Sequence, residues 1–242
     1  MCAQKHPHLH TLYYNTEVTE IISISPRIKR FFIRFPHDVH FQSGQFVIID
    51  FGKLPHPYAT RSYSIADVCN GPVIELCVSL KEDGAATPIL FHQKIGDVLR
   101  VSEPQGRFVL PETIEHKAIA FICTGTGVAP FRAMIKDLLL FRDYRDPVHL
   151  YFGCRTQAEI LYREEFEALQ AEHPNFIYTP VLSRENWEGA EGYVHAHYAK
   201  AFSEKPDALF YLCGWKDMLK ETRENLKSYG YTRSEIRIEF YD

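Results

Sequence analysis

The sequence predicts two domains: an antiparallel β-barrel in residues 1–112, followed by an α/β domain with a parallel sheet in residues 113–242. Two observations predict this division. Residues 11–110 contain short aromatic or β-branched runs separated by turn residues, which is typical of antiparallel barrels. From about residue 115, apolar strand candidates alternate with helical stretches, which favours a parallel sheet covered by helices on both faces.

The N-terminal half has three clear strand candidates, in residues 31–35, 45–51 and 73–80. Turn residues separate them, because glycine, proline and asparagine interrupt extended runs. These breaks are Ser43-Gly44, Asn70-Gly71-Pro72 and Gly96-Asp97. Only residues 87–92 suggest a helix, with Thr87 expected as its N-cap and Pro88 as its first residue.

The C-terminal half has five strand candidates and four helical stretches, joined to the first half by a linker at residues 110–115. The strands are expected in residues 118–123, 148–152, 176–181, 208–213 and 236–241, and the helices in 130–141, 162–170, 193–201 and 216–229. In such a sheet, ligands bind at the carboxyl ends of the strands, near the point where the strand order reverses.

Composition excludes several classes of protein. Hydrophobic residues make up 45% of the 242 residues, enough for a core, and the net charge of −4 gives no support to nucleic-acid binding. There is no apolar run of the roughly 20 residues that a membrane span needs, and no secretory leader pattern. The sequence therefore predicts a soluble, cytoplasmic protein without membrane insertion.

The cysteines and histidines do not predict a metal site. The six cysteines are scattered, without a C-x-x-C pair or the ligand spacing of an iron–sulfur cluster. His6, His8 and His10 lie close together and could bind a metal, but no further ligands flank them, so we interpret this segment as a mobile tail.

Two short motifs in the first half carry groups that suit a flavin. Arg61-Ser62-Tyr63-Ser64 offers a guanidinium for phosphate, an aromatic ring for stacking and hydroxyls for polar edges. Gly84-Ala85-Ala86-Thr87 leads into the predicted helix, whose free N–H groups would point at an anion. An ordinary strand with a surface arginine, and an ordinary helix start, are the alternatives.

A third motif, Gly125-Thr126-Gly127-Val128-Ala129-Pro130, directly follows a strand candidate and opens a helix. Glycines allow a pyrophosphate to approach the backbone closely, although proline stands where the dinucleotide fingerprint has a third glycine. Proline at a helix start loses no hydrogen bond. The motif favours nucleotide binding over a purely structural turn.

Further candidates lie at the ends of later strands. Cys213-Gly214 ends one of these strands, and Met218 follows four residues after Gly214. Ligands bind at this edge of such a sheet, which makes Cys213 a candidate site residue. The alternative is that Cys213 is only a core residue before a tight turn. Ser183 and Arg184 follow another, where a hydroxyl and a guanidinium would suit the 2′-phosphate of NADPH, unless they belong to a plain polar loop. Arg155 is a possible second cation for that phosphate.

In this order, the four motifs resemble the ferredoxin–NADP reductase superfamily over nearly the whole chain. They correspond to its R-x-Y-S, G-x-x-S/T, G-T-G-x-x-P and C-G-x-x-x-M stretches. The resemblance implies a flavin-binding barrel followed by a nucleotide-binding α/β domain, with FAD and NADP as cofactors. It implies that Arg61 and Thr87 bind the flavin pyrophosphate, that Tyr63 packs against the flavin with Ser64 near its N5, and that Cys213 lies beside the nicotinamide.

The C-terminus is similar to that of plant-type members. There, a glutamate assists the active site and a terminal aromatic ring covers the flavin until nicotinamide displaces it, and Glu239 and Tyr241 match those positions. One extra residue, Asp242, follows the tyrosine, which departs from the pattern.

The leading hypothesis is an FAD-dependent reductase that exchanges hydride with NADPH and single electrons with a separate carrier. The resemblance implies that this carrier is a ferredoxin or a flavodoxin. Arg27, Lys29, Arg30 and Arg34 form one candidate docking cluster for an acidic carrier, or else a solvated strand face. Two alternatives are the reductase component of an oxygenase system, and an electron-transfer or regulatory subunit that holds flavin without turnover.

Overall fold

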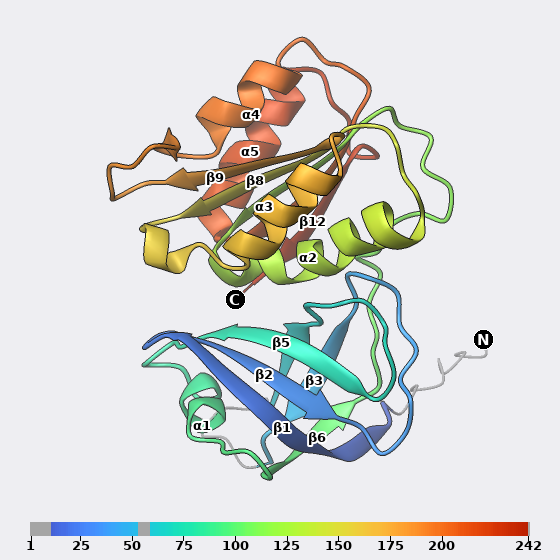
Figure 1. Cartoon of the computed structure of the whole chain (residues 1–242), viewed down its shortest axis with the longest axis vertical. Coiled ribbons are helices and arrows are strands. Elements are labelled where there is room, and N and C mark those ends of the chain that lie inside the picture. The colour runs from blue at the N-terminus through green and yellow to red at the C-terminus, as the bar shows by residue number, and fades with distance from the viewer. Residues whose placement is uncertain (1–10, 53–58, 242) are drawn as a thin grey trace, which may run out of the picture.

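The computed structural model describes residues 11–52 and 59–241, which form two domains stacked on each other (Figure 1). The C-terminal end of the chain lies between the two domains. The histidines at positions 6, 8 and 10, and Asp242, lie outside the described residues. No helix among the described residues is long and apolar enough to cross a membrane.

The first domain is a six-stranded antiparallel sheet that curls into a barrel. Its strands pair in the order β4-β3-β6-β1-β2-β5. They are β1 (Tyr13–Ser25), β2 (Ile28–Arg34), β3 (Phe46–Asp50), β4 (Thr60–Ser64), β5 (Val73–Ser79) and β6 (Val98–Ser102). The two outer strands meet just beyond β4, where Ile65 bridges Leu76 and the Ala66 amide donates to the Glu75 carbonyl at 2.8 Å. Alternating side chains such as Phe31 and Ile33 fill the interior.

The short helix α1 (Thr87–Phe91) follows β5, as predicted, but its cap differs from the expectation. The N-cap is Ala86 and not Thr87, so Pro88 is the second helical residue. The Thr87 hydroxyl instead accepts a hydrogen bond from the Lys81 amide (2.9 Å) and donates one to the Lys81 carbonyl (3.0 Å). The prediction was wrong because the preceding loop uses the hydroxyl that a cap would need.

The second domain is a parallel sheet in the order β10-β9-β8-β7-β11-β12. Its strands are β7 (Ile119–Thr124), β8 (Val148–Cys154), β9 (Phe176–Leu182), β10 (Ala190–Glu191), β11 (Leu209–Gly214) and β12 (Ile236–Phe240). The helices are α2 (Ala129–Lys136), which continues as a π-turn (Asp137–Phe141), α3 (Arg163–Glu172), α4 (His195–Phe202) and α5 (Lys216–Ser228), with 3₁₀ turns at Gly125–Val128 and Gln157–Glu159. The fold class predicted from the sequence is confirmed; the two-residue strand β10 was not foreseen.

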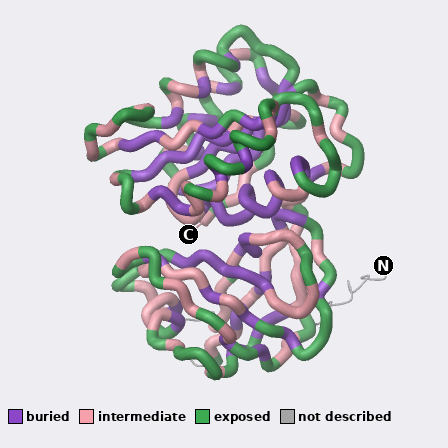
Figure 2. The backbone as a smooth tube through the Cα atoms, viewed as in Figure 1, coloured by how far each residue is buried: buried purple, intermediate pink, exposed green. Residues whose placement is uncertain are grey.

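Helices cover both faces of the parallel sheet. Apolar residues of α2 and α3, such as Phe131 and Phe166, pack on one face, and those of α4 and α5, such as Tyr198 and Leu219, pack on the other. The first of these cores does not stop at the domain boundary, because Ala66 and Cys77 of the barrel belong to it. Figure 2 shows buried segments on both sides of the junction. The boundary predicted at residue 112 lies in the connection between β6 and β7 and stays a prediction.

Gly44, in the turn before β3, lies where the barrel meets α2. Its φ is +99°, a backbone conformation that favours glycine, and a Cβ there would overlap the methyl group of Met134 and the carbonyl oxygen of Phe108. Gly96 has a similar φ of +92°, but a Cβ there would meet nothing within 4 Å.

We therefore expect Gly44→Ala to destabilise the protein more than Gly96→Ala. Both changes introduce backbone strain of about 1–2 kcal/mol, and only Gly44→Ala adds overpacking of about 1–3 kcal/mol. Urea unfolding of both variants measures the two costs. Equal losses would mean that the crowding at Gly44 relaxes without cost.

Candidate active site

Three neighbouring parallel strands bring the candidates from the second domain side by side. Cys213 of β11 pairs in register with Cys123 of β7 on one side and with Glu239 of β12 on the other. Cys123 and Cys213 belong to the core that faces the barrel. Burial, followed by the charge of Glu239, raises the pKa of Cys213 well above its usual range, so Cys213 is a neutral thiol.

Glu239 is an unusual carboxyl group. Its Oε2 atom is buried and has no hydrogen-bond partner within the described residues. Burial alone raises the pKa of Glu239 from 4.5 to about 7. A carboxyl group with such a pKa exchanges a proton near neutrality, and its open oxygen offers a hydrogen-bonding site to a ligand.

Tyr241 joins this group from the chain end and connects it to the barrel. Its ring packs against the shared core, and its hydroxyl makes polar interactions with Ser64 of β4 and with the Cys213 thiol. Burial raises the pKa of Tyr241 well above its usual range, and the Ser64 interaction opposes that shift only in part. Ser64, Cys213, Glu239 and Tyr241, which lie far apart in the sequence, therefore form one cluster at the domain junction.

The remaining flavin candidates lie on β4 and before α1. Arg61 and Tyr63 pair with Ile49 and Val47 of β3, and strand alternation directs them to the face opposite Ser62 and Ser64. The Arg61 guanidinium donates to the Thr60 carbonyl (2.8 Å), Ser62 is exposed, and the Tyr63 ring packs against the barrel core.

The loop before α1 is shaped by its small residues. A Cβ at Gly84 would lie 2.9 Å from the Lys81 carbonyl oxygen, so the turn there depends on glycine. Ala86 is buried under the start of α1. These positions, with Thr87, make up a compact loop.

The turn after β7 contains two glycines in different surroundings. Gly125 has a φ of +54° and faces open space, with nothing within 4 Å of a Cβ. A Cβ at Gly127 would lie 2.6 Å from the Cys213 carbonyl oxygen, so this glycine serves close packing between two loops. Thr126 lies between them, and the buried Pro130 is the second residue of α2.

The loop after β11 packs against the same turn. Gly214 has a φ of +135°, and a Cβ there would overlap Thr124. The next amide, of Trp215, donates to the Thr124 hydroxyl at 2.9 Å. Met218, in the first turn of α5, packs against the opposite core and accepts a hydrogen bond from Thr222 (3.5 Å). Cys213 is thus held by backbone contacts on both sides.

The cationic candidates meet at the carboxyl edge of β8 and β9. The Ser183 amide and hydroxyl donate to the Cys154 carbonyl (3.0 and 3.2 Å), and the Arg184 amide donates to the Arg155 carbonyl (3.0 Å). The Arg155 guanidinium lies 5.7 Å from the ring centre of Trp215, which is 64% exposed. Sequence reasoning missed Trp215, although its place directly after Cys213-Gly214 was a usable signal.

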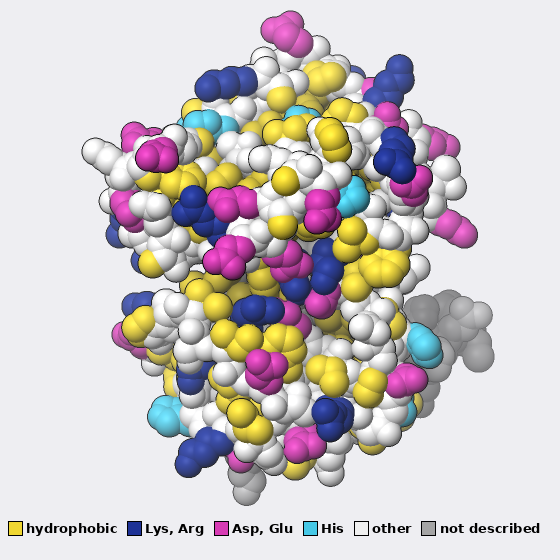
Figure 3. Space-filling model, in the orientation of Figure 1, with side chains coloured by type: hydrophobic (Ala, Val, Ile, Leu, Met, Phe, Trp, Pro, Cys, Tyr) yellow, Lys and Arg dark blue, Asp and Glu magenta, His cyan; other side chains and the backbone are white. Residues whose placement is uncertain are grey.

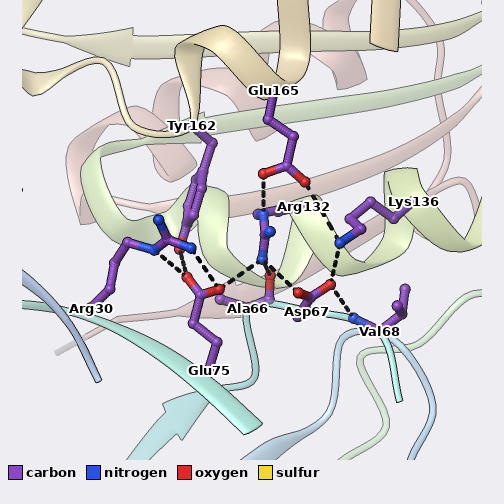
Figure 4. Close-up of polar contacts among 9 residues, drawn as sticks. All are labelled: Arg30, Ala66, Asp67, Val68, Glu75, Arg132, Lys136, Tyr162 and Glu165. Carbon is purple, nitrogen blue, oxygen red and sulfur yellow. Dashed lines mark hydrogen bonds and ion pairs between the residues drawn. The ribbon is translucent and has the colours of Figure 1, made fainter. Parts of the chain in front are cut away.

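A buried cluster of ionic side chains between the domains was also missed (Figure 4). Arg132 of α2 is its centre: one guanidinium nitrogen donates to the Ala66 carbonyl (2.7 Å) and the Glu75 carboxylate (3.0 Å), and another donates to Glu165 (2.7 Å). Burial disfavours the charge of Arg132, but the carboxylates around it outweigh this and hold its pKa above the usual range. A charged residue inside the apolar helix that follows Pro130 was the available signal.

Comparison with known proteins agrees with this architecture. A family model for an oxidoreductase FAD-binding domain matches residues 15–110, and one for an oxidoreductase NAD-binding domain matches residues 121–224. Ferredoxin--NADP reductase B of Sorangium cellulosum is 33% identical over 214 residues, which cover 84% of this chain and 86% of that protein. The chain belongs to the ferredoxin–NADP reductase superfamily.

Some of the similar proteins are longer than this chain. The reductase component DmpP of phenol 2-monooxygenase from Pseudomonas sp. (strain CF600) is 36% identical over 216 residues, 85% of this chain and 59% of that protein. The chain thus spans about three fifths of that relative. Among solved structures, the cytochrome P450 reductase GcoB of Amycolatopsis superposes with a TM-score of 0.86 at 26% identity, covering 95% of this chain and 69% of that one.

The residues present fit the two cofactors of this superfamily, FAD and NAD(P). The open oxygen of Glu239 and the thiol of Cys213 lie together at the junction of the two cofactor-binding domains. Gly125 leaves open space at the start of the turn before α2. No group of three or more metal-ligating side chains is gathered within residues 11–52 and 59–241.

Glu239 should make stability depend on pH. Its pKa is raised on folding, so the folded state holds a proton that the unfolded state has released between about pH 4.5 and 7. Stability therefore falls as pH rises through that range and levels off above it, a change of roughly 2–3 kcal/mol between pH 5 and 8. Glu239→Gln has no carboxyl group at this position, so its stability should not show this fall with pH. The free energy of unfolding in urea, measured at pH 5 and pH 8, should therefore be higher relative to the wild type at pH 8 than at pH 5. A difference that is the same at both values would show that Glu239 has an ordinary pKa.

Proposed function

We propose that this chain is an FAD-dependent reductase that takes hydride from NADPH and passes single electrons to a separate protein. The observation that carries the proposal is the cluster of Ser64, Cys213, Glu239 and Tyr241, which unites groups from both domains at their junction. When bound, FAD supplies the conversion between a hydride and single electrons. The protein has to hold and align the two cofactors.

On this proposal, the barrel holds the flavin. Arg61 would bind its pyrophosphate, and Tyr63 would pack against its ring, with Ser64 at the polar edge. Because its hydroxyl is bonded to Lys81, Thr87 would contribute through its backbone rather than its side chain. Gly84 and Ala86 would let the pyrophosphate approach that loop.

The second domain would hold the nicotinamide nucleotide. The turn from Gly125 to Pro130 suits its pyrophosphate, because glycine permits close approach and the helix start favours an anion. Arg155, Ser183 and Arg184 would bind the 2′-phosphate. Cys213 would contact the nicotinamide as a neutral group, with Gly214 and Met218 fixing the loop around it.

Tyr241 and Glu239 would control entry to this site. The Tyr241 hydroxyl interacts with both Ser64 and Cys213, so Tyr241 would have to move before a nicotinamide could lie there. Glu239, with a pKa of about 7, can accept a hydrogen bond from a ligand or take up a proton at the junction.

A separate electron carrier is the proposed partner, either ferredoxin or flavodoxin, and the cytoplasm is the proposed compartment. The free thiols of all the cysteines among the described residues suit a reducing environment. The cluster of Arg27, Lys29, Arg30 and Arg34 gives little support to docking. Arg30 is bonded to Glu75 (2.6 Å), Lys29 donates to the Phe91 carbonyl (2.9 Å), and Arg27 pairs with Glu82 (3.3 Å).

The likeness to DmpP favours a second candidate, in which the acceptor is an oxygenase component. Both candidates require rapid reduction of the flavin by a nicotinamide, whereas a regulatory subunit that only holds flavin does not. Anaerobic stopped-flow reduction of the purified protein by NADPH and by NADH tests the proposal. Rapid bleaching of the flavin after mixing supports a reductase. Flavin that stays oxidised over minutes with both nucleotides would exclude a reductase. Titration of the reduced protein with ferredoxin, flavodoxin and oxygenase components then separates the acceptors.

Coenzyme choice gives a sharper prediction. Arg184→Ala should weaken NADPH binding by roughly 1.5–3 kcal/mol, a factor of about 10–150, because a charge-assisted hydrogen bond to phosphate is lost. NADH has no 2′-phosphate, so its use should barely change. Steady-state kinetics of the variant with both coenzymes measure this difference. Arg163→Ala is the control, since Arg163 pairs with Glu167 (2.7 Å) on α3. Equal losses for both coenzymes in Arg184→Ala would remove Arg184 from phosphate recognition.

A further inference from the structure

We propose that Arg132 is a positioning residue that sets the flavin-facing end of β4 against the nucleotide-binding turn. The inference rests on the function proposed above and extends it to a residue that need not touch either cofactor. Arg132 is only 5% exposed and lies in the junction between the two domains.

The two segments that Arg132 joins are the ones that would carry the two reacting rings. Arg132 stands two residues after Pro130, where the turn after β7 enters α2. Its guanidinium donates to the carbonyl of Ala66, two residues after Ser64. A single side chain thus connects the backbone that follows Ser64 to the helix that follows the turn.

The ion cluster around Arg132 is electrically balanced. Arg30, Arg132 and Lys136 supply three positive charges, and Asp67, Glu75 and Glu165 supply three negative ones. Lys136 bonds Asp67 at 2.5 Å, and Arg132 lies 3.2 Å from the other Asp67 oxygen. Figure 3 shows basic and acidic side chains meeting along the junction. Because Arg132 and Glu75 (2% exposed) are shielded from water, salt screens their attraction only weakly.

A guanidinium is required at the centre of this cluster. Its nitrogens reach the Ala66 carbonyl, Glu75 and Glu165 in three directions, and a lysine ammonium on a flexible stem cannot reproduce that fixed fork. Lysine at position 132 would keep the charge but lose the alignment.

The start of α3 is drawn into the same cluster. Tyr162 has a φ of +57°, which is uncommon for a tyrosine. Its hydroxyl donates to Glu75 (2.7 Å), and the guanidinium carbons of Arg132 and Arg30 lie 4.6 and 5.0 Å from its ring centre. These contacts compensate the backbone strain and stiffen the junction.

Alignment matters here because hydride transfer needs the reacting atoms about 3–3.5 Å apart, and a misplacement of about 1 Å can cost roughly 100-fold in rate. Loss of Arg132 should therefore slow hydride transfer more than it weakens the binding of either cofactor. A residue that only stabilised the fold would lower the melting temperature without changing this rate.

The test compares Arg132→Met and Arg132→Lys with the control Arg142→Met. Arg142 directly follows the π-turn after α2, pairs with Asp137 (3.0 Å) and donates to the Pro111 carbonyl (2.7 Å), so its loss removes similar bonds away from Ser64. In stopped-flow reduction at saturating NADPH, Arg132→Met should be at least about tenfold slower than the wild type. Arg132→Lys should lie between them and Arg142→Met within about twofold of the wild type, with flavin content and nucleotide affinity retained in all.

Amide hydrogen exchange, measured without nucleotide, supplies a readout that does not depend on activity. In Arg132→Met, exchange should accelerate together in residues 64–67 and 125–132, and Arg142→Met should leave both segments unchanged. If nicotinamide fails to reduce even the wild type, the proposed function is wrong, while the exchange data still judge the positioning role. A wild-type hydride-transfer rate in Arg132→Met, or in Arg132→Lys should the first variant not fold, would overturn the proposal, as would unchanged exchange.

Discussion

The structure depends on the pairing of one buried carboxylate, that of Glu75. Burial of an ionised group in a protein interior costs several kcal/mol unless charged partners and hydrogen bonds compensate it. Arg30, Arg132 and the Tyr162 hydroxyl all donate to this carboxylate, and two of the three donors come from the other domain. Separation of the domains would expose the apolar residues at the junction and leave Glu75 with one partner. The junction is therefore a fixed part of the fold, and the site can be built across it.

Backbone packing, rather than side-chain bonding, positions the chemistry at the edge of the parallel sheet. Gly127 lies against the Cys213 carbonyl, and Gly214 lies against Thr124, so the loops after β7 and β11 pack closely against each other. Cys213 is then set between Cys123 and Glu239 by strand register alone. The Oε2 atom of Glu239 has no hydrogen-bond partner among the described residues, and burial raises the pKa of this carboxyl group.

Much of this could be predicted from the sequence, because periodicity and turn residues act locally. The barrel strands β2, β3 and β5, five strands of the parallel sheet, the glycine turn before α2 and the cysteine near the end of β11 all follow from short patterns. The strands β1, β6 and β10 were not among the strand candidates. Two features could not be read in this way. The Thr87 hydroxyl is bonded to Lys81, six residues away, in place of capping α1. The bonds of Arg132 and Tyr162 to Glu75 span 57 and 87 residues, and one sequence does not show which of its many charges pair across such distances.

The order of the strands has a consequence for biosynthesis. Ser64 emerges from the ribosome roughly 150–180 residues before Cys213, Glu239 and Tyr241, an interval of about 7–35 s at typical rates of translation. For the first part of that interval, until α2 (Ala129–Lys136) has been made, the barrel lacks the helix that carries Arg132, and Glu75 lacks the guanidinium of that residue. β11 and β12, which carry Cys213 and Glu239, come last in sequence order among the described strands. The nascent barrel therefore passes through a stage in which its junction surface is exposed and Glu75 lacks its partners from the second domain. At that stage, chaperone binding and aggregation compete with completion of the fold.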